Sequence, residues 1–362
     1  MKLLVWHWGR RGGGPLFTLR LAAALGDIPG LNVRLSLAGG AEILAGAAAP
    51  LCGWREPTYD NALGYAVQRL TGPLVRGRVT RRLMEDRPDF AICAMPALLD
   101  PRMTMALRRA GIPYAMVVHD AAAHPGEALN FRIMGQWRQQ RDARVLFALT
   151  RHVEDALRRQ GFGGPGQRVV KLWHPPISLG AMAPVMAHGG PPRLLYFGRL
   201  LPYKGLDLLA EAMERIAPDV PLQLRVCGDG PDSPGLKRLR AMPGVRVEQR
   251  WVGEEEVPAL LAWADAVVLP YQEASQSGVA ALAIAAGRYV LATEVGGLPE
   301  QLAGVPGASL CAPTAAAIAR GLIQLTVDLA GAAMLAGGRG PVDASADWAA
   351  MAQTMLAALK PL

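Results

Sequence analysis

Residues 194–205 read LLYFGRLLPYKG, and this stretch is the most informative part of the sequence. An apolar run ends in Gly198, and Arg199 follows at once. After a short loop, Lys204 and Gly205 precede a segment whose apolar residues have helical spacing. This order predicts a strand, a turn and a helix start. It puts two positive charges and bare backbone amides at the carboxyl end of a strand, where open α/β sheets bind ligands and where a helix N-terminus favours anions. We therefore expect this stretch to bind a phosphate or diphosphate.

On both sides of this stretch, apolar runs alternate with helix-like segments, which predicts parallel sheets with right-handed crossovers. In the first half the expected strands are residues 3–6, 33–37, 90–94, 114–118, 145–149 and 169–172. In the second half they are residues 194–197, 224–227, 245–248, 266–269, 290–292 and 309–310. A loop rich in Pro, Gly and Ala at residues 175–192 separates the two series and is the expected linker.

The chain has 362 residues, which is too long for one ordinary α/β core. Its 51% hydrophobic and 19% charged residues exclude a disordered protein. We predict two Rossmann-like, doubly wound α/β domains, residues 1–178 and residues 179–344. Helical spacing over residues 348–359 predicts a terminal helix after the second sheet.

The positive charge is concentrated in the first half of the chain. Residues 1–180 contain 24 Lys and Arg against 13 Asp and Glu (+11), and the rest contain 14 against 17 (−3), which sum to the net +8. Residues 74–84, LVRGRVTRRLM, mix arginines with apolar residues, which fits an anionic membrane surface or a phosphate-bearing lipid better than nucleic acid. The alternative is a solvated helix face in an arginine-rich chain.

The first eleven residues lack the pattern of a signal peptide, and no apolar run is long enough to span a bilayer. We therefore expect a cytoplasmic protein, peripheral at the inner face of the plasma membrane.

A glycine cluster follows the first expected strand: residues 9–15 read GRRGGGP. The amides of Gly12, Gly13 and Gly14 can approach a phosphate or sugar closely because these residues have no side chain. The cluster has neither the frame of a G-x-G-x-x-G fingerprint nor a P-loop lysine. A flexible turn is the alternative interpretation.

His119 and Asp120 follow the expected strand at residues 114–118. A histidine there can donate to a sugar hydroxyl or act as an acid or base near pH 7. A metal pair of His119 with His124 lacks a third ligand, and a helix-capping pair is the other alternative. The remaining histidines show no partner pattern and are expected to be structural or at the surface: His7, His152, His174 and His188.

Two further turns in the second half follow strands. The first leads through a hydroxyl-rich segment to Ser277, Gly278 and Val279, whose N–H groups at a helix start would form a second anion site. The second turn carries Glu300 in the first turn of a helix. Glu300 is either a carboxylate that stabilises the helix dipole or a ligand contact.

Together these segments resemble the retaining, nucleotide-sugar-dependent glycosyltransferases of GT-B architecture, specifically glycosyltransferase family four (group 1). The motifs that carry the resemblance are Gly198-Arg199, Tyr203-Lys204-Gly205, Cys227-Gly228-Asp229-Gly230, residues 264–271 (ADAVVLPY) and residues 295–300 (VGGLPE). The resemblance is thinner in the first half, where it rests on Gly12–Gly14 and His119-Asp120.

The resemblance implies that Arg199 and Lys204 hold the donor's diphosphate and that the loop at residues 12–14 lies against its phosphates. It also implies that His119 orients the donor sugar. The two domains are then expected to face a cleft, with the last helix crossing back so that residues 345–362 join the first domain.

One departure from the family concerns two glutamates, eight positions apart, which in the family contact the donor sugar and the ribose. The matching positions here are Ala274 and Leu282. A subset with a Gln-Ser-Gly turn matches residues 276–278, and the adjacent Glu273 is a candidate substitute for the first glutamate.

The function implied is retaining transfer of a hexose from a UDP- or GDP-sugar to a saccharide or lipid-linked saccharide in bacterial cell-envelope or exopolysaccharide synthesis. Arg199 and Lys204 would stabilise charge on the leaving diphosphate. No Asp-x-Asp motif is present, so the sequence does not require a divalent metal ion. We expect no cofactor besides the nucleotide sugar as co-substrate, and no nucleic-acid partner. The alternatives are a nucleotide-sugar epimerase or phosphorylase on the same fold, or a non-catalytic homologue that binds nucleotide sugar.

Overall fold

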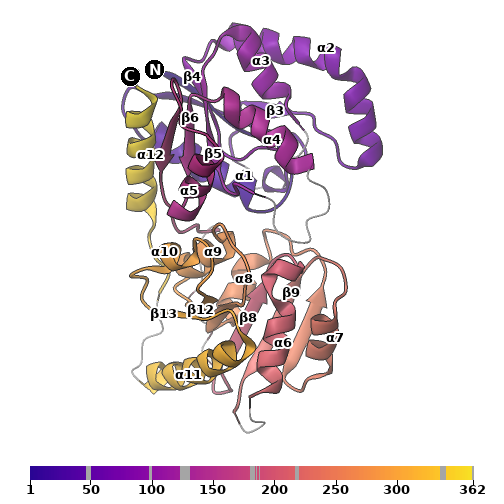
Figure 1. The fold of residues 1–362 in the computed structure, drawn as a ribbon, viewed down its shortest axis with the longest axis vertical. Helices are drawn as coiled ribbons and strands as arrows, with labels where there is room; N and C mark the ends of the chain where they lie inside the picture. The colour runs from indigo at the N-terminus through magenta and orange to yellow at the C-terminus, as the bar shows by residue number, and fades with distance from the viewer. Residues whose placement is uncertain are drawn as a thin grey trace. The chain divides into compact units, whose positions relative to one another are not determined.

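The computed structural model describes residues 1–45, 50–97, 100–122, 131–179, 184, 186, 188–216, 220–334 and 340–360. These residues form two compact units, which we call unit 1 and unit 2 (Figure 1). Of the described residues, unit 1 contains those up to 122, residues 131–173 and residues 345–360. Unit 2 contains the described residues between 174 and 344.

Unit 1 is built on a seven-stranded parallel sheet with the order β3-β2-β1-β4-β5-β6-β7. Its strands are β1 (Lys2–His7), β2 (Asn32–Ala38), β3 (Trp54–Glu56), β4 (Phe90–Cys93), β5 (Tyr114–Val118), β6 (Val145–Ala148) and β7 (Arg168–Lys171). The strand order reverses beside β1, so the carboxyl ends of β1 and β4 flank the switch point at which such sheets bind ligands.

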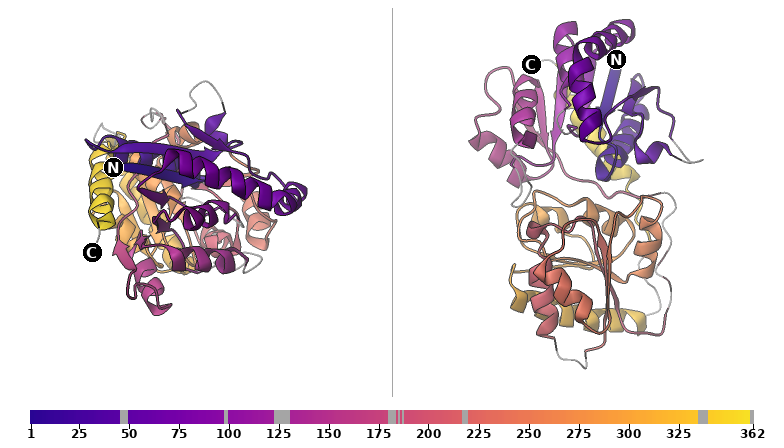
Figure 2. Two further views of the ribbon diagram at one scale, coloured as in Figure 1. Left: turned by 90° about the horizontal axis from the view of Figure 1, so that it is seen from above. Right: turned by 90° about the vertical axis from the view of Figure 1, so that its right-hand side faces the viewer.

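Helices cover both faces of this sheet (Figure 2). They are α1 (Gly13–Gly26), α2 (Ala62–Asp86), α3 (Arg102–Ala110), α4 (Phe131–Asp142), α5 (Arg151–Arg159) and α12 (Ser345–Leu359), with a short 3₁₀ turn at Glu42–Leu44. Apolar side chains of α2, α3 and α5 share one core with β1, β4 and β5. The terminal helix α12 packs against α1, where the rings of Phe17 and Trp348 lie 5.2 Å apart.

Unit 2 contains a six-stranded parallel sheet with the order β10-β9-β8-β11-β12-β13. Its strands are β8 (Arg193–Phe197), β9 (Gln223–Gly228), β10 (Val245–Gln249), β11 (Ala266–Leu269), β12 (Tyr289–Thr293) and β13 (Ala308–Cys311). The order reverses between β8 and β11, so the carboxyl end of β8 lies at the switch point of this sheet.

Helices also cover both faces of the second sheet. They are α6 (Leu206–Glu214), α7 (Pro234–Ala241), α8 (Val257–Trp263), α9 (Gly278–Ala285), α10 (Leu298–Leu302) and α11 (Ala315–Met334), with a 3₁₀ turn at Pro202–Lys204. Alternation along β8 sends Tyr196 into the core shared with α6, α7 and α11, and Leu195 into the core shared with α8, α9 and α10. Unit 2 is therefore doubly wound, as the sequence predicts.

None of the helices in the described ranges combines the length and the apolar character that crossing a membrane requires.

Candidate functional site

The turn after β8 is held by close backbone approach to the end of β9. Gly198 has a φ of +130°, and its N–H donates to the Cys227 carbonyl at 3.0 Å. A β-carbon on Gly228 would lie 1.7 Å from the Gly198 carbonyl oxygen. The Leu200 N–H donates to the Asp229 carbonyl at 2.8 Å. The two glycines are therefore needed for the backbone path that brings Arg199 to the switch point.

Arg199 and Lys204 come together around two tyrosine rings. The Arg199 Nη2 donates to the Tyr203 hydroxyl at 2.6 Å. The Lys204 Nζ lies 3.6 Å from the centre of the Tyr271 ring and 5.1 Å from that of Tyr203. Burial raises the pKa of Tyr271 to about 12, so this phenol is neutral at physiological pH and does not offset the two positive charges. Arg199 and Lys204 thus bring two positively charged groups to the carboxyl end of β8.

The 3₁₀ turn that carries Lys204 is fixed against the end of β11. The Gln272 N–H donates to the Tyr203 carbonyl at 2.8 Å. Gly205, with a φ of +74°, lies so close to Pro270 that a β-carbon would be 1.7 Å from the Pro270 carbonyl oxygen. This contact joins residues 202–205 to the neighbouring strand and sets the start of α6.

The hydroxyl-rich turn after β11 ends at the N-terminus of α9. The Ser277 hydroxyl accepts from the Ala280 N–H at 3.2 Å and so caps the helix. The Ser277 N–H donates to Gln301 Oε1 at 2.8 Å, and Gln301 Nε2 donates back to the Ser277 carbonyl at 2.9 Å. Ser277 is therefore a cap whose own N–H is bonded to Gln301, whereas Gly278 and Val279 provide the first N–H groups of the helix.

The positions of the two absent glutamates lie at the core of unit 2. Ala274 is 1% exposed and packs in the core cluster that contains Tyr271 and Leu298. Leu282 packs partly buried against the same cluster. A carboxylate at Ala274 would thus be surrounded by apolar groups. Glu273, next to it, is half-buried, and Glu300 is half-buried in the first turn of the short helix α10.

In unit 1 the glycine loop lies over the His7 ring. His7 is buried, and its Nδ1 donates to the Met95 carbonyl at 2.7 Å. A β-carbon on Gly9 or Gly14 would lie 2.4 or 2.5 Å from His7 Nε2. A β-carbon on Gly12 or Gly13 would meet none of the described atoms within 4 Å. Gly9 and Gly14 are therefore needed to accommodate His7, and the backbone at Gly12 and Gly13 is accessible to a ligand.

His119 lies at the carboxyl end of β5 but is packed into unit 1. It is 4% exposed, its ring meets the Phe17 ring edge-on at 5.0 Å, and its Nε2 hydrogen-bonds the Ala94 carbonyl at 3.0 Å. Because a carbonyl oxygen only accepts, Nε2 carries a proton and donates this hydrogen bond, which orients the His119 ring.

His124 lies outside the described residues, so the metal pair with His119 stays a hypothesis. Among the described residues, no group of three or more His, Cys, Asp or Glu side chains is placed to hold a metal ion.

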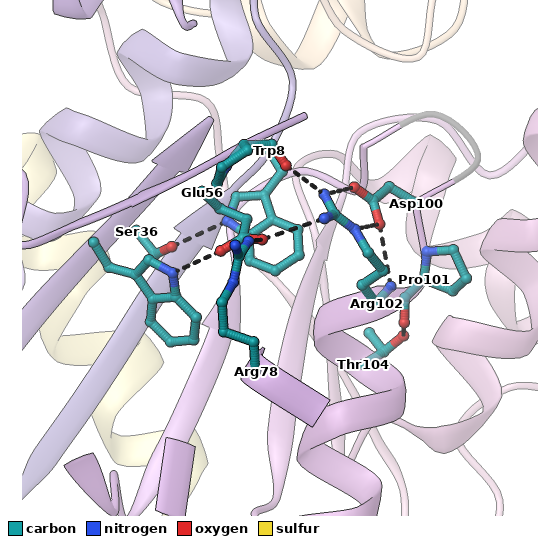
Figure 3. Close-up of polar contacts among 10 residues, drawn as sticks. Trp8, Ser36, Glu56, Arg78, Asp100, Pro101, Arg102 and Thr104 are labelled. Carbon is teal, nitrogen blue, oxygen red and sulfur yellow. Dashed lines mark hydrogen bonds and ion pairs between the residues drawn. The ribbon is translucent and has the colours of Figure 1, made fainter. Parts of the chain in front are cut away.

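A buried ion cluster, which the sequence analysis missed, joins β3, α2 and α3 (Figure 3). The Arg102 guanidinium is 5% exposed and donates to both Asp100 oxygens at 2.8 and 2.7 Å. Its Nη1 also donates to Glu56 at 3.2 Å, and Arg78 donates to the same Glu56 oxygen at 2.6 Å. The buried Arg102 thus compensates two buried carboxylates, and the half-exposed Arg78 adds a second positive charge at Glu56.

This cluster holds the loop after β3 and the start of α3. The Glu56 Oε2 accepts from the Trp54 indole at 3.1 Å, and the Arg102 guanidinium lies 5.0 Å from the Trp8 ring centre. The partners are as many as 46 residues apart in the chain, so spacing along the sequence carries no signal for them. We assign the cluster to the stability of unit 1.

The architecture matches solved structures over nearly the whole chain. Sucrose-phosphate synthase from Thermosynechococcus elongatus superposes with a TM-score of 0.68 at 18% identity, covering 99% of this chain and 96% of that one. The UDP-GlcNAc 2-epimerase of Neisseria meningitidis, bound to UDP-GlcNAc, superposes with a TM-score of 0.61 at 12% identity, covering 99% of this chain and 100% of that one. The fold is thus the two-domain, Rossmann-like GT-B fold, as the sequence predicts.

The family similarity lies in unit 2. Residues 191–328 match the family of group 1 glycosyl transferases. A GDP-mannose:glycolipid 4-beta-D-mannosyltransferase of Xanthomonas campestris pv. campestris is 27% identical over 203 residues, which are 52% of this chain and 52% of the relative. The match thus spans about half the length of that relative. These similarities support a GT-B glycosyltransferase, which is the broader part of the predicted resemblance.

Proposed function

We propose that this chain is a retaining glycosyltransferase that transfers a hexose from a UDP- or GDP-sugar to a saccharide or lipid-linked saccharide. The observation that carries the proposal is the Arg199–Lys204 pair at the carboxyl end of β8. This pair lies at the switch point of unit 2 and within the stretch that matches group 1 glycosyl transferases. A site with two cations and a nearby helix N-terminus suits a diphosphate.

The proposed roles of Arg199 and Lys204 follow from where negative charge develops during sugar transfer. As the bond between the anomeric carbon and the diphosphate oxygen breaks, negative charge grows on the leaving diphosphate. Arg199 and Lys204 stabilise that charge, and the N–H groups of Gly278 and Val279 add to the positive potential. The acceptor hydroxyl attacks from the side of the leaving group and gives its proton to the departing diphosphate oxygen, which retains the anomeric configuration.

The proposed reaction uses the nucleotide sugar as co-substrate and needs no other cofactor. In many transferases a divalent ion neutralises the diphosphate. Here the two fixed cations of unit 2 would take that role, so turnover should continue in the presence of a chelator. Among the proposed donor contacts, Gly12, Gly13 and Gly14 lie in unit 1, and Gly198, Glu273, Gly278, Val279 and Glu300 lie in unit 2.

A lipid-linked acceptor fits the surface of α2. Leu63, Val67 and Leu70 follow helical spacing on this helix and are 75%, 52% and 82% exposed. Residues 62–84 of the helix contain five arginines and no acidic residue. Apolar side chains beside arginines suit the interface of an anionic membrane, so we propose a cytoplasmic enzyme that is peripheral at the inner face of the plasma membrane. The name of the Xanthomonas relative specifies a glycolipid, which agrees with this acceptor class.

The membrane contact can be tested by sedimentation with vesicles at low salt. We expect binding to vesicles that contain phosphatidylglycerol and not to pure phosphatidylcholine. The double variant Leu63→Ser/Leu70→Ser should lose this binding, whereas Leu51→Ser, which changes another exposed leucine of unit 1, should retain it. Equal binding by both variants would exclude α2 as the contact.

The transferase proposal is tested with a panel of UDP-, GDP- and ADP-sugars. Thermal shift identifies the donor that binds, and the mass of the product after addition of saccharide or polyprenyl-linked acceptors shows what is transferred. Linkage analysis by NMR then reports the anomeric configuration. Transfer with inversion would exclude the retaining mechanism.

A nucleotide-sugar epimerase is the second candidate, because an epimerase with bound UDP-GlcNAc has the same fold over 99% of this chain. An epimerase would release an isomerised nucleotide sugar without any acceptor. A phosphorylase would form a sugar phosphate from inorganic phosphate, and a non-catalytic homologue would bind nucleotide sugar and release no product. Product analysis therefore separates these alternatives from a transferase.

A further inference from the structure

We propose that Tyr271 is a positioning residue for Lys204: the face of its ring holds the ammonium group at the carboxyl end of β8 before an anion arrives. This inference deepens the proposed function and rests on it for the identity of the anion, a nucleoside diphosphate. The placement of Lys204 by the ring can be measured without any ligand.

The contact has the geometry of a cation–π interaction. The Lys204 Nζ lies 3.6 Å from the ring centre of Tyr271, well within the range of about 6 Å over which such pairs attract. Tyr271 is 1% exposed, so water has little access to its ring. The phenol stays neutral, so Tyr271 attracts the Lys204 ammonium through the π-face of its ring and not through a phenolate charge.

Tyr271 has polar contacts both at its backbone and at its hydroxyl. The Thr293 hydroxyl donates to the Tyr271 carbonyl at 2.5 Å, and the Tyr271 hydroxyl lies 3.4 Å from that of Ser277. Ser277 caps α9, so Tyr271 joins Lys204 to the helix N-terminus that the proposed diphosphate would also contact. The Tyr271 side chain thus contacts both Lys204 and the capping residue of α9.

Arg199, the other cation of the proposed anion site, contacts Tyr203 as Lys204 does. The Arg199 guanidinium bonds to the Tyr203 hydroxyl, and its Cζ lies 5.9 Å from the centre of the Tyr203 ring. Lys204 Nζ lies 5.1 Å from the same ring centre. A lysine has a flexible four-carbon stem, and without the Tyr271 ring it would sample positions farther from the arginine.

The competing explanation is that Tyr271 only fills the core of unit 2. Two variants separate the two roles. Tyr271→Phe keeps the ring face and removes the hydroxyl, and Tyr271→Leu removes the ring. Tyr114→Leu serves as the matched control, because Tyr114 is an equally buried tyrosine in the core of unit 1.

The first measurement is the affinity for UDP, GDP and inorganic pyrophosphate by calorimetry. We expect Tyr271→Leu to bind each probe about tenfold more weakly and Tyr271→Phe to bind within about threefold of wild type. Tyr114→Leu should lower the unfolding free energy without changing affinity. If Tyr271→Leu and wild type bind alike, the inference is wrong.

The second measurement varies the electron density of the ring at position 271. Affinity should not depend on this density if Tyr271 only fills the core. Phenylalanines with increasing fluorination at position 271 have nearly constant shape but a progressively weaker π-face. We expect affinity to fall with each added fluorine. An affinity that does not depend on fluorination would overturn the inference.

The third measurement needs no ligand. In protein labelled with ¹³C-lysine, the ε-methylene signal of Lys204, assigned by its loss in Lys204→Ala, should be shifted upfield by the ring in wild type and Tyr271→Phe and unshifted in Tyr271→Leu. An unshifted signal in wild type would refute the positioning role while the proposed function stands. A shifted signal in a protein that binds no nucleotide would support the positioning role and refute the proposed function.

Discussion

Gly205 and Pro270 come so close that a β-carbon on Gly205 would lie 1.7 Å from the Pro270 carbonyl oxygen. The contact joins the turn that carries Lys204 to the end of β11. Gly205 also has a φ of +74°, a region that L side chains rarely adopt. Steric overlap and backbone conformation therefore both require glycine here.

Replacing this glycine should destabilise unit 2 and disorder the anion site. We expect Gly205→Ala to cost about 3 kcal/mol of unfolding free energy, from strain at positive φ and displacement of the β11 end. Gly278→Ala is the control, since its β-carbon would meet none of the described atoms within 4 Å, and we expect a change below about 1 kcal/mol. Urea denaturation measures both, and equal losses would contradict the role of the Pro270 contact.

Lys204 should matter for turnover more than for stability. We expect Lys204→Ala to lower kcat/KM by roughly two to three orders of magnitude, because it removes a charge that stabilises the leaving diphosphate. Lys237→Ala removes an exposed lysine of unit 2 that lies 3.6 Å from Asp232, and it should leave turnover unchanged. Steady-state kinetics with the donor found in the nucleotide-sugar panel provide the comparison. A Lys204→Ala enzyme as fast as wild type would refute the assignment.

Replacing Arg102 or Arg78 in the ion cluster of unit 1 should lower the unfolding free energy by different amounts. Arg102→Met leaves the Glu56 and Asp100 carboxylates buried without their main partner, and we expect a loss of about 3–5 kcal/mol. The side chain of Arg78 is 49% exposed, and Glu56 keeps Arg102 in its absence, so Arg78→Met should cost at most about 1 kcal/mol. Chemical denaturation tests this order, and the reverse order would show that Arg78 carries the charge compensation.

Unit 1 should lose stability in mild acid because of His7. Burial lowers the pKa of His7 from 6.5 to about 4, so the folded state binds fewer protons than the unfolded state between these values. Stability therefore rises with pH through this window and is lost as pH falls below 6.5. The contribution lost by about pH 5 is about 2 kcal/mol.

The variant His7→Asn should make the unfolding free energy less dependent on pH across this window, measured by denaturation at about pH 7 and about pH 5. His152→Asn, which changes an exposed histidine of α5, should keep the wild-type dependence. If His7→Asn keeps the full dependence, other groups cause the acid sensitivity.

The alternation of strands and helices was predictable because each buried strand is an apolar run bounded by turn residues. Apart from β3, every strand of the structure was predicted to within two residues at either end. β3, at Trp54–Glu56, was missed because three residues are too few to show a period. The terminal helix was predictable from its spacing, whereas its packing on α1 depends on contacts such as Phe17–Trp348 that only the folded chain brings together.

The candidate site was predictable where it depends on neighbours in the sequence. Arg199, Lys204 and the two glycines that flank them, Gly198 and Gly205, occupy one short stretch. The Tyr271 support, the Gln301 bonds to Ser277 and the packing of Gly9 against His7 link separate segments, so no local pattern predicts them. The expectation that Ser277 presents its N–H to an anion failed for this reason, because Gln301, 24 residues away, already accepts that hydrogen bond.

The return of α12 to unit 1 has a consequence for biosynthesis. Residues 345–359 are translated after all the described residues of unit 2, yet they supply the Trp348 ring that packs on Phe17. During translation, α1 therefore lacks its contact with α12 until residues 345–359 have been synthesised. The strands of unit 2 lie between residues 174 and 344, so its sheet can form before then. Unit 1 thus begins to be translated before unit 2 but gains its helix α12 only after unit 2 has been translated.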